Sequence, residues 1–174
     1  MKILALDASF TSTGYAVLDN KLNVIECGKV TPKEKLPDSK RILEICDKCE
    51  ELISKYSISK VVIEEQYVKR NPNTALKLSR LFGAIIYLTS ICDVELIPME
   101  ASKIRKILLG NGKADKEEVA GYVLYYYKDS DIVKNIGPYS DKKNKKKTSD
   151  IYDAISIGMS YIIGVNSGEN FKSI

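Results

Sequence analysis

The chain has 174 residues, of which 44% are hydrophobic and 29% are charged, and a formal net charge of +4, a profile typical of one globular domain. It contains no histidine, which excludes Ser-His-Asp and Cys-His catalysis and imidazole metal ligation. The first apolar stretch is short and interrupted by Asp7, and the longest apolar tract, 151–165, is too short to span a bilayer. We therefore expect a cytoplasmic protein with no membrane segment.

Two of the four cysteines, Cys46 and Cys49, form a CxxC pair. With no second pair and no histidine in the sequence, a zinc site would lack half of its ligands. Both cysteines share the apolar stripe of an expected helix with Ile45 and Leu52. We therefore predict that they pack in the core.

The expected elements begin with a buried strand before Asp7, followed by a hairpin that turns at Asp19-Asn20. Segments with helical spacing of apolar residues then alternate with short apolar strands. We predict strands over 2–6, 13–19, 22–30, 60–68 and 94–97, and helices over 40–56, 74–92, 102–109, 115–127 and 149–164. This order is typical of an α/β domain with a mixed sheet.

The sequence contains no internal repeat and no linker, so we expect a single domain over 1–166. Within it, the segment 129–148 is polar, and five of the six residues from 142 to 147 are lysines. We predict a basic mobile loop there and a frayed tail over 167–174.

Two of the apolar strands, the first and the fourth, end in a carboxylate. Asp7 ends the first, and Glu64 or Glu65 ends the fourth; because side chains alternate along a strand, the two glutamates point in opposite directions. Parallel neighbours bring such ends to one edge of a sheet, where ligands bind. Asp150 and Asp153 lie on one face of the last helix, which suggests that all these acids converge.

A convergence of acids has a chemical consequence. Each close pair of like charges costs about 4 kcal/mol at 4 Å with an effective dielectric constant near 20, so the cluster requires cations. All-oxygen ligation favours Mg²⁺ or Mn²⁺. Two such ions activate a water molecule and stabilise both oxygens of an in-line displacement, so acids without histidine predict phosphodiester hydrolysis.

Four blocks of sequence carry a family resemblance: LALDASFTSTGYAV, VIEEQYVKRNPNTALKLSRLFG, LLGNGKADKEEV and SDIYDAISIGMSY. They span nearly the whole chain, and with them the chain resembles the RuvC family of Holliday-junction resolvases, within the ribonuclease H-like superfamily. The resemblance implies a mixed five-stranded sheet, with three antiparallel strands followed by parallel ones, flanked by helices. It also implies a Mg²⁺-dependent endodeoxyribonuclease that resolves Holliday junctions or related branched DNA by paired cuts.

The resemblance assigns roles to particular residues. It implies four catalytic and metal-binding acids, with Glu64 chosen over Glu65 by the spacing to the ALKL motif: Asp7, Glu64, Asp150 and Asp153. It adds Lys116 as a catalytic lysine at the scissile phosphate, and two Mg²⁺ ions, replaceable by Mn²⁺. The expected DNA-binding residues are Tyr67, Lys69, Arg70, Lys103, Arg105, Lys106, Lys113, Lys142, Lys143, Lys145, Lys146 and Lys147.

The family is dimeric, as suits a substrate with near two-fold symmetry. The helix from Thr74 to Cys92 corresponds to the family's dimer helix, and an apolar seam is expected from Leu78, Leu81, Phe82 and Ile85. Two features depart from the family pattern and are similar to phage-encoded members: Ala8-Ser9 replaces Pro-Gly after the first aspartate, and the segment 129–148 is longer and more basic.

Alternatives remain for both the function and single residues. The chain also fits a ribonuclease for structured RNA precursors, like the YqgF relatives, or a catalytically silent module that binds branched DNA. Tyr67 could pack in the core instead of stacking on unpaired bases. Lys116 could be a solvated helix residue, and the lysine run a solvated loop instead of a contact to DNA phosphates.

Overall fold

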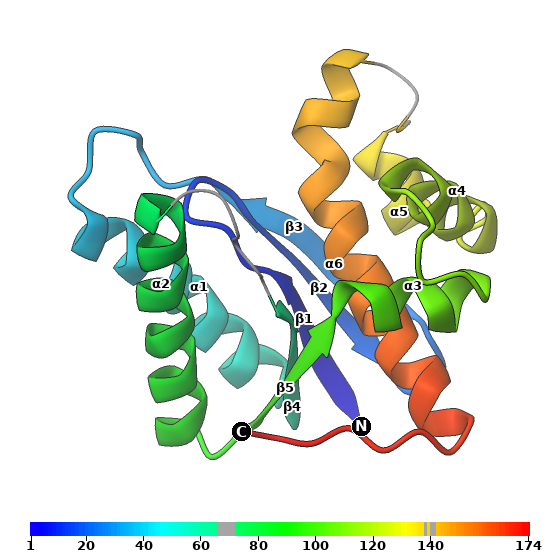
Figure 1. Ribbon diagram of the computed structural model, residues 1–174, viewed down its shortest axis with the longest axis horizontal. Coiled ribbons are helices and arrows are strands. Elements are labelled where there is room, and N and C mark those ends of the chain that lie inside the picture. Colours follow the sequence, from blue (N-terminus) through cyan, green and yellow to red (C-terminus); the bar gives the residue numbers. More distant parts are fainter. Residues whose placement is uncertain (66–71, 138, 140–141) are drawn as a thin grey trace.

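A five-stranded sheet with the strand order β3-β2-β1-β4-β5 lies at the centre of the computed structural model (Figure 1). The structure describes residues 1–65, 72–137, 139 and 142–174, the side chains of 142–147 excepted. The strands are β1 (Lys2–Asp7), β2 (Thr13–Asp19), β3 (Val24–Val30), β4 (Lys60–Glu65) and β5 (Glu95–Glu100). The helices are α1 (Asp38–Tyr56), α2 (Pro72–Ile91), α3 (Ala101–Leu109), α4 (Lys116–Tyr126), α5 (Asp131–Ile136) and α6 (Lys142–Asn166).

The first three strands pair antiparallel, and β4 and β5 then add in parallel to β1. This confirms the expected mixed sheet of the ribonuclease H-like type. The hairpin differs in detail, since β3 begins at Val24 and not at residue 22. Leu22 adopts a positive φ of 68°, and the Asp19 carboxylate accepts hydrogen bonds from the amides of Lys21 and Asn23, which closes a longer turn.

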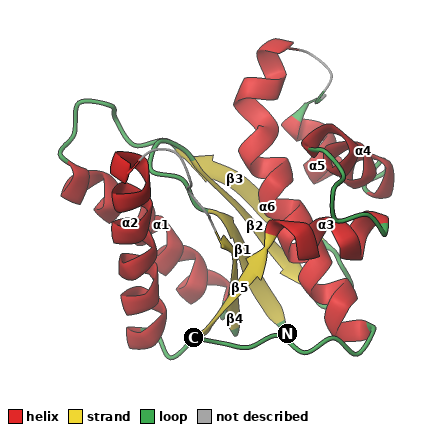
Figure 2. Ribbon diagram, in the orientation of Figure 1, coloured by secondary structure: helices red, strands yellow, loops and turns green. Residues whose placement is uncertain are grey.

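Helices cover both faces of the sheet (Figure 2). Side chains alternate between the two faces along β1. Leu4 and Leu6 face the core formed with α1 and α2. Ile3 and Ala5 face the core formed with α6. A strand that is apolar on both faces needs a helical layer on each. The expected packing of the cysteines is confirmed as well, since Cys49 is buried on the inner face of α1 and Cys46 is partly buried against the same core.

Helix α6 approaches the sheet so closely that two contacts require glycine. A Cβ at Gly14 on β2 would lie 1.9 Å from the carbonyl oxygen of Asp150, and a Cβ at Gly158 would lie 2.4 Å from Leu18 Cδ1. At Gly14 the clash would be with backbone and excludes a side chain, whereas at Gly158 a side chain would have to displace the buried Leu18. These glycines therefore fix the height of α6 above the β1–β2 hairpin.

The segment 129–148, expected to be a mobile loop, is largely helical in the residues that the structure describes. Residues 131–136 form α5, capped by the Ser130 hydroxyl, and α6 already begins at Lys142 instead of at residue 149. Tyr152 of α6 makes two contacts with this region. Its hydroxyl donates a hydrogen bond to Gly137 O at 2.7 Å, and its ring packs edge-on against Tyr139. Lysine is a good helix former, so the run extends α6.

The tail after α6, expected to be frayed, lies against the domain. Phe171 packs on Tyr161 and occupies the space left by the missing side chain of Gly164. The backbone amide of Ile174 donates a hydrogen bond to Leu96 O on the edge strand β5. The tail thus joins the C-terminal turn of α6 to the sheet.

Helix α2 has an unusually exposed apolar surface. By length and composition alone it could cross a membrane, and only 22% of its most apolar 18-residue window is buried. The expected apolar seam is partly wrong, because Leu81 and Ile85 face the core and are each 1% exposed. The large exposed apolar side chains of α2 are instead Leu76, Tyr87 and Ile91.

Candidate active site

The acids at the ends of β1 and β4 lie side by side on the face covered by α6. Leu6 pairs with Ile63 in the parallel register, which places Asp7 and Glu64 level with each other one position further on. Glu64 shares the alternation of Val62, which lies in the α6-side core, whereas Glu65 points to the other face and is exposed. The sheet geometry therefore gives a physical reason to prefer Glu64 over Glu65.

Helix α6 brings the other two acids to this edge. Asp150 lies directly over Gly14, which itself pairs with Asp7 across the β1–β2 hairpin. Asp153 follows one helical turn later and acts electrostatically on both Asp7 and Glu64. The close packing that Gly14 allows is therefore what brings a helix residue to the strand ends.

Three of the four acids, Asp7, Glu64 and Asp153, have raised pKa values, because burial and mutual repulsion outweigh the effect of the nearby cations. Asp7 is 8% exposed, and burial, together with the charges of Asp153, Glu64 and Asp150, raises its pKa to about 7 despite the nearby Lys116. Burial also raises the pKa of Glu64 and of Asp153, against the opposing effect of Lys116. Partly buried carboxylates that repel one another in this way attract cations.

Lys116 supplies the nearest cation. It occupies the first turn of α4, whose start is fixed by a capping box between Asp115 and Glu118. Its Nζ donates a hydrogen bond to Asp153 Oδ2 at 2.6 Å. Burial disfavours the ammonium, but the charges of Asp153, Asp7 and Glu64 outweigh this and raise the Lys116 pKa.

The arrangement has the chemistry of a hard-cation site but not yet its geometry. Among the described residues, no three Asp, Glu, Cys or His side chains stand close enough together to hold one metal ion. Asp153 pairs with the Lys116 ammonium, and Asp150 accepts a hydrogen bond from Ser12. The donors are nevertheless all carboxylate oxygens, which suit Mg²⁺ or Mn²⁺ and not zinc.

Ser12 is a residue that the sequence did not single out. Its hydroxyl donates to Asp150 Oδ2 at 2.5 Å, and the Ser149 hydroxyl lies 3.3 Å from the other oxygen, Oδ1. The only hint in the sequence is the run of small and hydroxylated residues from Ser9 to Thr13. Nothing in that run indicates a partner 138 positions away.

The structure separates the basic residues expected to bind DNA. Burial raises the pKa of Glu64 and of Asp153, and Arg105 lies close enough to the cluster for its charge to oppose this rise. Lys103 points away, since it forms an ion pair with Glu169 at 3.1 Å and lies over the Phe171 ring. Lys106 lines a hollow with Lys103 between α3 and the end of α6, and Lys113 is exposed on the turn before α4.

Several expected DNA-binding residues lie outside the described part of the chain. Tyr67, Lys69 and Arg70 fall in the undescribed segment 66–71. The backbone of α6 is described from Lys142, but the side chains of the lysine run are not: Lys142, Lys143, Lys145, Lys146 and Lys147. Their roles stay predictions.

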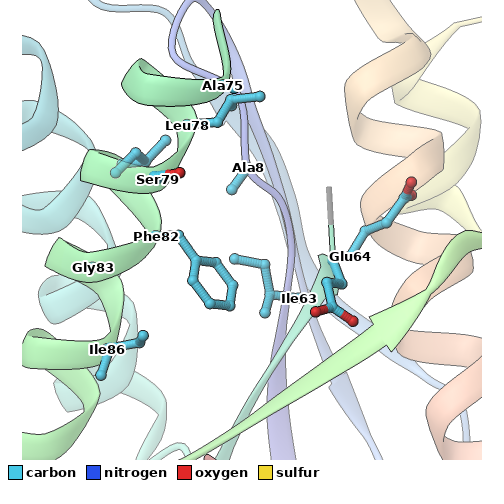
Figure 3. Close-up of a pocket in the computed structure, with 11 residues that line it drawn as sticks. Ala8, Ile63, Glu64, Ala75, Leu78, Ser79, Phe82, Gly83 and Ile86 are labelled. Atoms are coloured by element: carbon cyan, nitrogen blue, oxygen red, sulfur yellow. The ribbon is translucent and has the colours of Figure 1, made fainter. Parts of the chain in front are cut away.

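An apolar hollow of about 430 Å³ lies behind the cluster, between α2 and the ends of β1 and β4. Figure 3 shows Phe82 and Ile63 facing each other across it, with Ala8 and Leu78 nearby. Glu64 and Glu65 also line it, so this hollow borders the acidic edge from the α2 side.

Comparison with known proteins identifies the family of the chain. The family model described as "Crossover junction endodeoxyribonuclease RuvC" matches residues 3–160. The protein of that name from Prosthecochloris aestuarii is 30% identical over 162 residues, covering 91% of this chain and 80% of its own length.

Two solved structures have the same fold. Thermus thermophilus RuvC superposes with a TM-score of 0.80 at 20% identity, with full coverage of both chains. T. thermophilus RuvC in complex with a Holliday junction substrate gives a TM-score of 0.79 at 19% identity, covering 100% of this chain and 99% of the other. The chain belongs to the RuvC family of crossover junction endodeoxyribonucleases.

Proposed function

We propose that this crossover junction endodeoxyribonuclease cuts branched DNA, four-way junctions above all, by Mg²⁺-dependent paired cleavage as a homodimer. The family's dependence on divalent metal and the T. thermophilus complex with a Holliday junction support the cofactor class and the substrate. The observation that carries the assignment of the site is the mutual repulsion of Asp7, Glu64 and Asp153 around one lysine at the carboxyl edge of the sheet.

The four acids Asp7, Glu64, Asp150 and Asp153 are the proposed ligands of two metal ions. Their oxygen donors and the raised pKa of Asp7 fit a cation that takes over the charge compensation. When bound, divalent ions supply a nucleophilic water at neutral pH and stabilise the oxygens of an in-line phosphoryl displacement. The protein contributes the fixed spacing of the acids on β1, β4 and α6.

Lys116 is proposed to neutralise the scissile phosphate. Its ammonium reaches the cluster from α4, which packs against α6, and pairs with Asp153. A cation that is held by a carboxylate in the free enzyme can exchange that partner for a phosphate oxygen. The Asp115–Glu118 capping box keeps the first turn of α4, and hence Lys116, in place for this exchange.

The surface beside the cluster carries further cations for the DNA backbone. Arg105 is the best placed of the described ones, because its charge already acts on Glu64 and Asp153. Contacts from Lys106, Lys113 and the lysine run at the start of α6 are proposed to add affinity without sequence selectivity. Tyr67 remains the proposed stacking residue.

Helix α2 is the proposed dimer surface. Its exposed side chains Leu76, Tyr87 and Ile91 are 51%, 68% and 59% exposed, which is costly for an apolar face in water. Replacing Tyr87 and Ile91 together by glutamate should convert the dimer into a monomer in sedimentation experiments. The resulting chain should nick one strand of a junction without the matching second cut.

A cleavage panel tests the proposal. Purified wild-type protein is incubated with a four-way DNA junction, a linear duplex of the same sequence and a structured RNA, in Mg²⁺, in Mn²⁺ and in EDTA. We expect cleavage of the junction at symmetric positions in Mg²⁺ and Mn²⁺ and no cleavage in EDTA. Preferential cleavage of the RNA would indicate the YqgF-like activity, and junction binding without any cleavage would indicate a silent module.

A further inference from the structure

The loop after β1 also contacts the helices on the other side of the sheet. Phe10 is 6% exposed, and two cations lie over its ring. The Cζ of Arg41, from the first turn of α1, lies 4.7 Å from the ring centroid, and Nζ of Lys77, from α2, lies 5.1 Å from it. One aromatic ring thus brings together two positive charges from different helices.

Arg41 is nearly buried, and it forms no ion pair with a carboxylate of the described residues. It is 8% exposed, and its Nε is buried without a hydrogen-bond acceptor in the part of the chain that the structure describes. The nearby carboxylate of Asp38 is directed elsewhere, to Lys77 and Arg80, at 3.5 Å from each. A cation–π contact does not compensate for desolvating a guanidinium, so this site favours an additional anion.

The start of α1 indicates where that anion would lie. The helix begins after Pro37, which has no side-chain acceptor, and no side chain caps its first amides among the described residues. The Lys40 and Arg41 amides donate to Pro37 O, so the amides of Asp38 and Ser39 and the helix dipole favour negative charge at the turn that carries Arg41. Lys77 and Arg80 are about half-exposed there, so an anion from solution can reach the site.

We propose that Phe10, Arg41, Lys77 and the first turn of α1 form a binding site for a backbone phosphate of the DNA, separate from the acidic cluster. The inference rests on the proposed function, because DNA is the ligand. Phe10 follows Asp7 by three residues, at most about 10 Å of extended chain. That distance is about three base steps of one strand, so the same DNA can occupy both sites.

The test replaces Arg41 by methionine and measures binding of a four-way junction in Ca²⁺ over a range of salt concentrations. We expect affinity to fall about 5- to 30-fold and the slope of log affinity against log salt to become shallower by about 0.9, the loss of one phosphate contact. The melting temperature should not fall, because an apolar side chain suits an unpaired buried position. Lys21→Met, at the exposed hairpin turn, is the control of equal charge change and should bind like the wild type.

A second variant avoids the core. Lys77→Gln changes a partly exposed side chain and should make the salt slope shallower by a similar amount. Unchanged affinity and slope in both variants, with normal wild-type binding, would refute DNA as the ligand of this site and leave the proposed function intact. If inorganic phosphate raises the melting temperature while both variants bind DNA normally, the ligand is a free anion and the DNA assignment is wrong. Failure of the wild type to bind any branched DNA would instead refute the proposed function.

Discussion

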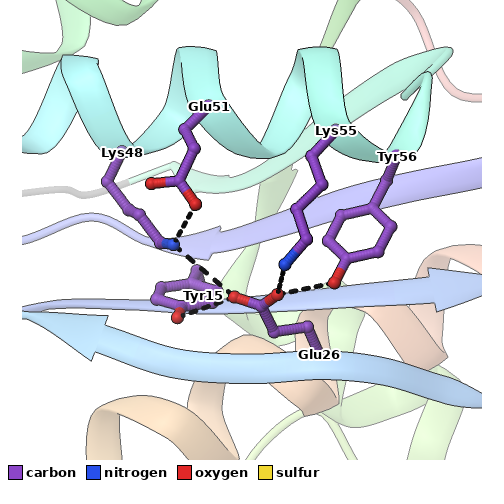
Figure 4. A network of polar contacts seen from close by, with 6 residues as sticks. All are labelled: Tyr15, Glu26, Lys48, Glu51, Lys55 and Tyr56. Atoms are coloured by element: carbon purple, nitrogen blue, oxygen red, sulfur yellow. Dashed lines mark hydrogen bonds and ion pairs between the residues drawn. The ribbon is translucent and has the colours of Figure 1, made fainter.

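Two carboxylates of the same sheet, Glu26 and Asp7, lie in opposite electrostatic environments. Glu26 on β3 accepts hydrogen bonds from Tyr15, Lys55 and Tyr56 at 3.2, 2.7 and 2.6 Å (Figure 4). Lys48 adds its charge at 3.6 Å. Although partial burial acts in the other direction, these donors hold the pKa of Glu26 at about 2.

Asp7 on β1 has the reverse environment. It is more deeply buried, its neighbours are other acids, and its pKa is raised to about 7. Glu26 has several hydrogen-bond donors and cations around it, and these contacts hold α1 against the edge of the sheet. Asp7 has too little positive charge around it, and a cation from solution can supply it. The contrast teaches that the same side-chain chemistry stabilises the fold at Glu26 and leaves an uncompensated demand for positive charge at Asp7, where the metal site is proposed.

The largest effect should come from removing the unsatisfied charge. We expect Asp7→Asn to lower junction cleavage at least about 10³-fold, because the proposed site loses a ligand shared by its ions. The same substitution should raise the free energy of unfolding of metal-free protein at pH 7 by about 2–3 kcal/mol, since the pKa of Asp7 lies about three units above its ordinary value. Cleavage rates and urea unfolding in EDTA measure the two effects.

Junction binding by Asp7→Asn provides the control for that experiment. Binding in Ca²⁺ should stay within about threefold of the wild type if the substitution acts on catalysis and leaves the surface intact. A variant that still cuts junctions in Mg²⁺ would contradict the metal-site assignment.

Both the stability of the protein and its cleavage activity should depend on pH through Asp7. Between about pH 4 and pH 7 the folded chain holds a proton on Asp7 that the unfolded chain has lost, so the stability of metal-free protein should fall as pH rises through this window. Metal requires the ionised form, so cleavage at limiting Mn²⁺ should rise about tenfold per pH unit up to about pH 7 and then level off. Flat profiles for both quantities would contradict the raised pKa.

Removing the charge of Glu26 should change the free energy of unfolding in the opposite direction, and by less, than removing the charge of Asp7. We expect Glu26→Gln to lower the free energy of unfolding at pH 7 by about 1–2 kcal/mol, after allowance for solvent screening at this partly exposed site. The difference from the wild type should shrink as pH falls from about 4.5 toward 2, because the wild-type carboxylate then becomes protonated. Junction cleavage should not change, and a loss of cleavage would remove the distinction between the two carboxylates.

The smallest expected effect concerns Ser12. Ser12→Ala removes the hydrogen bond that orients Asp150, so the Mn²⁺ concentration needed for half-maximal binding should rise about two- to fivefold. Direct Mn²⁺ titration by electron paramagnetic resonance measures this without turnover. Ser9→Ala is the matched control. Within the described residues, the hydrogen bonds of the Ser9 hydroxyl are with the hydroxyl and the amide of Thr11 and do not reach Asp150.

Much of the fold was predictable because local signals agree with the final structure. The apolar run before Asp7 and the hairpin after it predict β1 and β2, and the helical spacing from residue 40 predicts α1. The family resemblance chose Glu64, and the sheet register supplies a physical reason for that choice. The catalytic roles of the four acids stay predictions.

What sequence reasoning missed depends on contacts between distant segments. The polar composition of 129–148 suggests a loop, yet Tyr152 secures Gly137, and a lysine-rich segment extends α6 once the apolar part has nucleated the helix. The dimer seam was misjudged for a similar reason, since only the packed structure shows that Leu81 and Ile85 face the core.

Because α6 is one continuous helix, its lysine-rich start and its two acids belong to a single stiff rod. In Figure 1 the first turns of this helix project beyond the sheet, and at a rise of 1.5 Å per residue Lys142 lies about 12 Å along the axis from Asp150. A tilt of the projecting turns would therefore also move Asp150 and Asp153, close to the contact between α6 and Gly14. Under the proposed function, contact of DNA with the lysine-rich start of α6 and alignment of the proposed metal ligands Asp150 and Asp153 are mechanically coupled.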